Sequence, residues 1–197
     1  MAQDTRPLPE TASQTAGPYV HIGLSPKEAG FEIYANELGA EIAEPGVLGT
    51  RIRVEGTVWD GEGAPVRDVM IEVWQADAKG AYAPHGAVAS GFRGWGRVIC
   101  DFDTGAWGFD TIMPGTADDH APHLCLWIAA RGINTGLHTR LYFPDHADLH
   151  SDDPVLRLIP QAQQQTLVAQ RDTDAPIPLY RFDIVLQGEG ETVFLDI

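Results

Sequence analysis

The amino-acid sequence predicts an all-β fold, a sandwich or barrel with little helix. Three observations lead to this prediction. Apolar residues recur with a period of two, 21 glycines and 14 prolines separate the segments that show this period, and helical patterns are scarce. A chain of 197 residues with 44% hydrophobic content is long enough to bury one core. We therefore expect one β domain over residues 20–197, preceded by an extended N-terminal arm over residues 1–19.

The first 19 residues differ in composition from the rest of the chain. Pro7, Pro9 and Pro18 interrupt regular backbone pairing, and few large apolar side chains are present. Such a segment cannot bury itself, so it is either disordered or held against another surface. At its end, Gly17-Pro18 is a turn dipeptide, and Tyr19 begins an apolar stretch that can anchor the arm.

The strands follow in order from residue 51. Residues 51–58 alternate between apolar and polar side chains, which indicates a strand with one solvent-exposed face. Residues 69–76 are apolar on both faces except at Glu72, which favours a central strand, and the short turn "WDGEGAPV" between the two predicts a hairpin. Further strands are expected at residues 106–113, 123–130, 139–143, 166–170, 179–187 and 191–197.

Helical patterns are limited to two short segments. Residues 32–42, "EIYANELGAEI", carry a weak apolar stripe. Residues 153–159, "DPVLRLI", place Pro154 where the first turn of a helix accepts proline.

Charge and composition exclude several classes of function. A formal net charge of −15 and a pI near 4.6 argue against nucleic acid or an anionic membrane as partner, since both require clustered cations. The N-terminus lacks the pattern of a secretory signal, no apolar run approaches the roughly 20 residues of a membrane span, and Cys100 and Cys125 form no CxxC pair. We therefore expect a cytoplasmic protein.

On so acidic a protein, an anionic ligand must be met by a local cation. Arg131 is the candidate, because it follows the apolar run "LCLWIAA" and emerges where a buried strand ends. The alternative interpretation is an ordinary ion pair.

The stretch "HAPHLCLW", residues 120–127, suggests a metal site. His123 and Cys125 share one face of the expected strand, and His120, Asp118 and Asp119 lie close in sequence. The alternative is that Cys125 packs as a small hydrophobic residue and His123 forms an ordinary hydrogen bond. The spacing matches no closed Cys/His zinc motif, which favours this structural role.

Four stretches give the sequence a family resemblance. "TASQTAGPYVHIGL", "GTVWDGEGAPVRDVMIEVWQADAKGAY", "GINTGLHTRLYF" and "YRFDIVLQGEGETVFLDI" resemble the intradiol ring-cleaving dioxygenases, in the expected order and over nearly the whole chain. The resemblance implies a β-sandwich of two mixed sheets. It also implies a non-haem ferric iron, held by two tyrosines and two histidines, and ring opening of a catechol by O₂ between its hydroxyl-bearing carbons.

The iron-binding pattern of this family is incomplete here. His123 occupies the first histidine position, Cys125 replaces the second, both tyrosine ligands are missing, and His120 stands where relatives carry an arginine. Tyr82 matches a family position that is not a ligand. Ferric iron is a hard cation, and a histidine beside a soft thiol supplies neither the charge nor the ligand count. The resemblance thus implies no metal in this chain and Fe(III) in a homologous beta-type partner subunit.

The role that this implies is that of a non-iron-binding alpha-type subunit in a hetero-oligomer. The complex would cleave protocatechuate (3,4-dihydroxybenzoate) with O₂ to 3-carboxy-cis,cis-muconate, in bacterial degradation of aromatic compounds. The family's N-terminal turn and one arginine reach into the partner's cavity. Carried over residue by residue, they assign substrate binding and no catalytic step to Thr15, Gly17, Pro18, Tyr19 and Arg131.

Three alternatives remain open at this point. The chain could be a self-sufficient metalloenzyme with a site around His120, His123 and Cys125, or a non-catalytic β-sandwich binding or scaffold module. It could also be an alpha-type subunit that serves another catechol acid.

Overall fold

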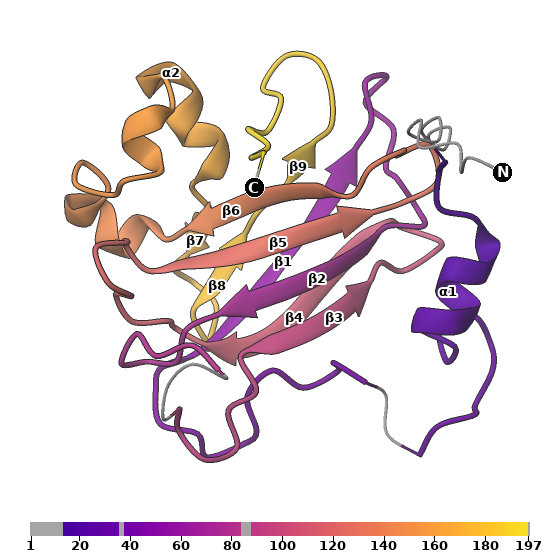
Figure 1. Cartoon of the computed structure of the whole chain (residues 1–197), viewed down its shortest axis with the longest axis horizontal. Coiled ribbons are helices and arrows are strands. Elements are labelled where there is room, and N and C mark those ends of the chain that lie inside the picture. The colour runs from indigo at the N-terminus through magenta and orange to yellow at the C-terminus, as the bar shows by residue number, and fades with distance from the viewer. Residues whose placement is uncertain (1–13, 36–37, 84–87, 197) are drawn as a thin grey trace, which may run out of the picture.

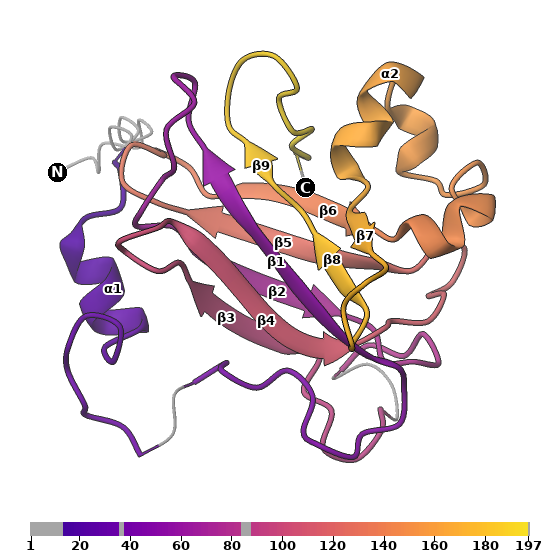
Figure 2. The same ribbon diagram turned by 180° about the vertical axis from the view of Figure 1, so that it is seen from behind.

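Two sheets pack face to face in the computed structural model, which describes residues 14–35, 38–83 and 88–196 (Figure 1). One sheet has the strand order β3-β2-β5-β6. Its strands are β2 (Met70–Gln75), β3 (Trp95–Ile99), β5 (His123–Ala129) and β6 (Leu137–Tyr142). The other sheet, nearer the viewer in Figure 2, has the order β4-β1-β8-β7, with β9 also paired to β1. Its strands are β1 (Arg51–Trp59), β4 (Ala106–Ile112), β7 (Gln170–Asp172), β8 (Leu179–Arg181) and β9 (Ile184–Val185).

Helical segments lie outside the two sheets. The α-helix α1 (Pro18–Leu24) lies beside one end of the sandwich, and the remaining helical turns gather at the opposite end (Figure 1). They are η1 (Pro144–Leu149), η2 (Leu156–Leu158), α2 (Gln161–Gln164) and η3 (Gln165–Leu167). No helix in the described ranges is long and apolar enough to cross a membrane.

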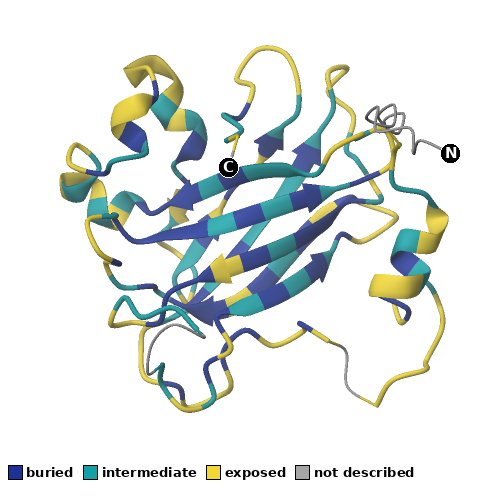
Figure 3. Ribbon diagram, in the orientation of Figure 1, coloured by how far each residue is buried: buried dark blue, intermediate teal, exposed yellow. Residues whose placement is uncertain are grey.

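The core lies between the sheets and sets the orientation of each strand. In β5, Leu124, Leu126 and Ile128 belong to this core, so the alternate side chains from His123 to Trp127 face the outside of the sheet. The strands in Figure 3 accordingly show alternating bands of burial. A second, smaller cluster around Tyr142 and Leu156 packs the helical turns against the outer side of β6.

The expected sandwich is confirmed, with one correction to the pairing. The sheet that contains β1 is mixed, because β1 runs antiparallel to β4 and parallel to β8 and β9. In the other sheet, all three strand pairings are antiparallel. The expectation of two mixed sheets therefore holds for one sheet only. Sequence alternation identifies a strand's faces, whereas pairing direction depends on the connections between strands.

The hairpin expected between residues 51–58 and 69–76 is wrong. A tight turn does form, since Val66 N–H donates to the Val58 carbonyl over 2.8 Å, but the chain then crosses to the other sheet. Each of these strands is central in its own sheet, as the two-sided burial of β2 predicted. The sequence thus predicted the turn after β1 correctly, but β2 pairs with β3 and β5 and not with β1.

Several other elements differ from the expectations. Residues 32–42 form no helix in their described part, and residues 153–159 form the 3-10 turn η2. Residues 166–170 begin in the turn η3 and end at the first residue of β7, and the described part of residues 191–197 makes an isolated bridge between Leu195 and His138. The strand β3 and the helix α1 were not predicted; the former is a five-residue segment whose second residue is Gly96.

The arm is only partly covered by the structure. Residues 1–13 lie outside the described ranges, residues 14–17 are irregular, and Pro18 already begins α1. Pro18 can occupy this first helical position because its missing N–H would have no partner there. The division into an arm over residues 1–19 and a domain over residues 20–197 stays a prediction.

Candidate functional site

Two groups of polar side chains lie at opposite ends of β5. His123 is the first residue of this strand, and Arg131 follows two residues after its end at Ala129. Eight residues separate the two, which corresponds to roughly 26 Å at the rise of an extended chain. Figure 1 shows β5 running from the side of α2 to the side of α1. The two groups are therefore separate sites, which we call the His123 cluster and the Arg131 cleft.

The Arg131 cleft has a volume of about 510 Å³ and lies between α1 and the loops that flank the antiparallel sheet. Its walls combine apolar side chains with two arginines and one aspartate. The lining includes Pro18, His21, Arg67, Asp68, Phe102 and Arg131. One positive charge in excess makes this cleft locally cationic on a chain whose net charge is −15.

Two of the five predicted substrate-binding residues line this cleft, and a third contacts the loop beside it. Pro18 and Arg131 line it, and the Thr15 hydroxyl accepts a hydrogen bond from the Gly132 N–H over 2.7 Å. Gly17 is the residue before α1 and has open space around its α-carbon. Tyr19 does not line the cleft, and 83% of it is exposed.

Arg131 forms an ion pair in this structure. Its Nε donates to a carboxylate oxygen of Asp68, whose side chain is largely buried, whereas 62% of the Arg131 side chain is exposed. Within the described ranges, the two terminal nitrogens of Arg131 form no hydrogen bond. The ion pair that we weighed against anion binding is thus present, yet it leaves the end of the guanidinium available.

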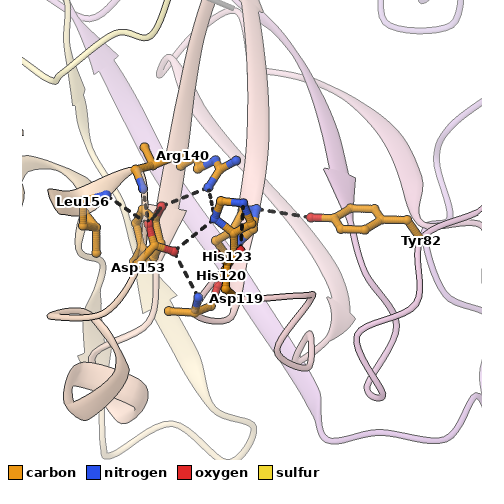
Figure 4. A network of polar contacts seen from close by, with 10 residues as sticks. Tyr82, Asp119, His120, His123, Arg140, Asp153 and Leu156 are labelled. Carbon is orange, nitrogen blue, oxygen red and sulfur yellow. Dashed lines mark hydrogen bonds and ion pairs between the residues drawn. The ribbon is translucent and has the colours of Figure 1, made fainter. Parts of the chain in front are cut away.

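The His123 cluster lies on the outer face of β5 and β6 (Figure 4). His123 is buried, its Nδ1 donates to the Ala121 carbonyl over 2.8 Å, and its Nε2 lies 3.2 Å from the Tyr82 hydroxyl oxygen, from which it can accept. Burial, together with the nearby charge of Arg140, lowers the pKa of His123 to about 4. The ring is therefore neutral at physiological pH.

Arg140 places a guanidinium inside the His123 cluster. It lies opposite Cys125 across the β5–β6 pairing, and its Nη1 donates to His120 Nδ1 over 3.1 Å and to the Tyr142 hydroxyl over 3.2 Å. The Tyr142 hydroxyl in turn donates to the carboxylate of Asp153 over 3.0 Å. These contacts connect the loop before β5, the strand β6 and the segment before η2 into one polar network.

Asp153 anchors the other side of this network. Its buried carboxylate accepts hydrogen bonds from the backbone N–H groups of Ala121, Val155 and Leu156 over 2.9–3.0 Å. Burial alone would raise the pKa of Asp153, but these donors and Tyr142 bring the pKa below its ordinary value. The carboxylate is thus ionised and accepts hydrogen bonds both from its own segment and from Ala121 and Tyr142.

The donors of the His123 cluster do not fit a ferric ion. Burial raises the pKa of Cys125, which keeps it a neutral thiol, and the Arg140 guanidinium lies beside the remaining donors. In the part of the chain that the structure describes, no group of three His, Cys, Asp or Glu side chains could hold a metal ion. In this structure His120, His123 and Cys125 do not come together as a group of three side chains that could hold a metal ion.

Four residues of these sites were not identified from the sequence. Asp68 and His21 contribute to the Arg131 cleft, and Arg140 and Asp153 to the His123 cluster. For Arg140 a signal was available, because strand alternation places it on the same face as Tyr142. Asp68 lies 63 residues before Arg131, so no local pattern relates the two.

Comparisons with known proteins agree with this geometry. The family described as "Dioxygenase" matches residues 35–188. The chain is 47% identical over 195 residues to the protocatechuate 3,4-dioxygenase alpha chain of Pseudomonas putida, covering 96% of this chain and 97% of that one. It is 34% identical over 161 residues to the beta chain of the Burkholderia cepacia enzyme, covering 74% and 68% respectively.

A solved structure supports the fold. The dioxygenase domain of a dioxygenase carbohydrate-binding fusion protein from Streptomyces sp. SirexAA-E has a TM-score of 0.61 at 23% identity, covering 83% of this chain and 96% of that one. The family match over residues 35–188 and the nearly full-length similarity to an alpha chain together identify the family. The chain therefore belongs to the intradiol dioxygenase family and is of its alpha-chain type.

Proposed function

We propose that this chain is the iron-free alpha subunit of a hetero-oligomeric protocatechuate 3,4-dioxygenase. Its partner would be a homologous beta subunit, and the complex would convert 3,4-dihydroxybenzoate and O₂ to 3-carboxy-cis,cis-muconate. In this proposal the Arg131 cleft completes the substrate pocket of the partner. Similarity to both alpha and beta chains of such enzymes supports it.

The observation that carries the proposal is the separation of the two sites along β5. Arg131 lies roughly 26 Å along the chain direction from His123, so it cannot reach the His123 cluster of its own subunit. The locally cationic cleft formed by the N-terminal turn and Arg131 can instead contribute to a pocket on another chain. This favours a role in a complex over a self-sufficient metalloenzyme.

The location of iron is part of the same proposal. The family depends on iron, and the His123 cluster offers a neutral imidazole, a neutral thiol and a guanidinium. We assign the iron to the partner subunit, where it would supply a binding site for the catechol oxygens and activation towards O₂.

The residues of this chain would bind and orient the substrate. The terminal nitrogens of Arg131 can donate two parallel hydrogen bonds to the benzoate carboxylate, directly or through water. Pro18 and Phe102 supply apolar wall beside that cation. Thr15 holds the loop after β5 in place, and exposed Tyr19 would meet the partner. Substrate contacts of Thr15, Gly17 and Tyr19, like the cytoplasmic location, stay predictions.

An Arg131→Ala variant in the assembled enzyme tests this role. Loss of a charge-assisted hydrogen bond to a carboxylate should lower kcat/KM for protocatechuate by roughly 10- to 100-fold. Activity towards catechol, which lacks the carboxylate, should change little. The matched control is Arg53→Ala, which removes another partly exposed, ion-paired arginine from the opposite sheet. Equal effects of Arg131→Ala on both substrates, or none on either, would contradict the proposal.

A further inference from the structure

We infer that Asp68 is a positioning residue of the Arg131 cleft. Its carboxylate would orient the Arg131 guanidinium towards the substrate carboxylate, and its backbone carbonyl would seat α1 at the other wall of the cleft. This inference rests on the proposed function of the cleft, and it adds a residue that contacts neither the substrate nor the reacting atoms.

The first part follows from which nitrogen Asp68 binds. A guanidinium presents one edge with Nε and another with the two terminal nitrogens. Asp68 accepts from Nε of Arg131, and the terminal edge forms no hydrogen bond with any residue that the structure describes, so this edge can face a second carboxylate. Asp68 is itself well fixed, because it is largely buried and lies two residues before β2, the central strand of the antiparallel sheet.

The second part follows from His21, the buried residue of α1. Its Nε2 donates to the Asp68 backbone carbonyl over 2.8 Å, and its ring packs edge-on against Phe102 with ring centroids 5.5 Å apart. Pro18, one turn earlier in the same helix, lines the cleft. Asp68 therefore contacts both walls, the arginine through its side chain and the helix through its backbone.

Fixing Arg131 in advance should strengthen substrate binding. An exposed arginine that samples many rotamers must be immobilised when it binds, and immobilising such a side chain costs about 0.5–1.5 kcal/mol. A competing role for Asp68 predicts the opposite change in substrate affinity. If Asp68 merely competes with the substrate for Arg131, its removal should tighten binding, because a negative charge leaves the cleft.

The test is Asp68→Asn in the assembled enzyme, assayed with protocatechuate and with catechol. We expect KM for protocatechuate to rise roughly 3- to 10-fold, the change that corresponds to immobilising one side chain. The value of kcat and the kinetics with catechol should stay within about twofold, because a positioning role acts on carboxylate binding. The matched control is Asp110→Asn, which breaks the Arg53–Asp110 pair of the opposite sheet.

Two results would overturn the inference. If Asp68→Asn leaves KM for protocatechuate unchanged or lowers it while Arg131→Ala raises it, the inference fails and the proposed function stands. If neither variant affects protocatechuate selectively, the proposed function fails and the inference with it.

If the Asp68→Asn chain does not form the complex, a second variant still tests the positioning role. Arg131→Lys keeps the charge, but a single ammonium cannot hold Asp68 and also present two parallel donors. We expect this variant to raise KM for protocatechuate and to leave catechol unaffected. An unchanged KM for protocatechuate would overturn the inference.

Discussion

The polar side chains at the start of β5 are arranged around the guanidinium of Arg140. It reaches His120 and Tyr142, while His123 is held separately between the Ala121 carbonyl and Tyr82. These contacts satisfy most of the buried polar groups, but the buried Nε of Arg140 has no hydrogen-bond partner among the described residues. The cluster acts as a structural network of the sandwich, and its histidine should titrate as a buried base.

His123 should make the chain less stable in mild acid. Its pKa is about 4 in the folded chain and near 6.5 when unfolded, because burial disfavours the charged ring. The unfolded chain binds more protons between these values, so stability is lost as pH falls from 6.5 towards 4, by about 3 kcal/mol in full. We expect chemical denaturation at pH 7 and pH 4.5 to show a smaller pH dependence in His123→Gln than in the unmodified chain. Equal pH dependence in the two proteins would contradict this.

The sequence identified individual functional residues better than it identified the residues that they contact. The shared face of His123 and Cys125 follows from strand alternation, and the missing tyrosine ligands were visible directly in the sequence. The contacts of Arg131 with Asp68 and of Arg140 with His120 join residues far apart in the chain. Such contacts depend on the pairing of strands, which no local pattern encodes.

Among the elements, β1 has an unusual set of neighbours. Its first part pairs in parallel with β8 and its last part with β9, and Gly56 lies between these two stretches. The Phe182 N–H donates to the Glu55 carbonyl over 2.8 Å, which brings the backbone of residue 182 directly over Gly56. A β-carbon at Gly56 would lie 2.0 Å from the Phe182 carbonyl oxygen. Glycine is required here by close approach of two backbones.

Gly56→Ala should therefore strongly destabilise the sandwich. A contact of this kind can be relieved only by moving the backbone between β8 and β9, which should lower the free energy of unfolding by about 3 kcal/mol. Gly23→Ala is the matched control, because nothing lies within 4 Å of the position of its β-carbon in α1. We expect the control to change stability by no more than about 1 kcal/mol. Similar unfolding midpoints for the two variants in urea would refute this account of Gly56.

The elements show what alternation can and cannot predict. The alternating segment of β1 and the apolar run of β2 were both located correctly, because each contributes side chains to the buried core. The partner of β2 was wrong, since the period of two defines faces and leaves pairing open. The helix α1 was not predicted, because its seven residues are too few to show a clear helical period of apolar side chains.

For the whole molecule, the sandwich holds two sites at opposite ends of one strand. One end carries a closed polar network, and the other carries an open, locally cationic cleft that the N-terminal turn completes. The family resemblance pointed to the missing iron ligands, and the sequence pattern singled out Arg131, which lines this cleft; its contact with substrate stays a prediction. They could not predict the separation of the two sites, which depends on β5 lying straight across the sheet (Figure 1).

The central claim is that iron belongs to the partner while this chain supplies the cleft. The most direct test is the iron content of the chain purified alone and of the complex formed with a homologous beta subunit. We predict that the complex holds iron in proportion to the beta subunit and absorbs visible light, as tyrosinate bound to ferric iron does. The chain alone should be colourless and should lose any iron on dialysis. A stoichiometric iron ion that this chain retains by itself would contradict the account.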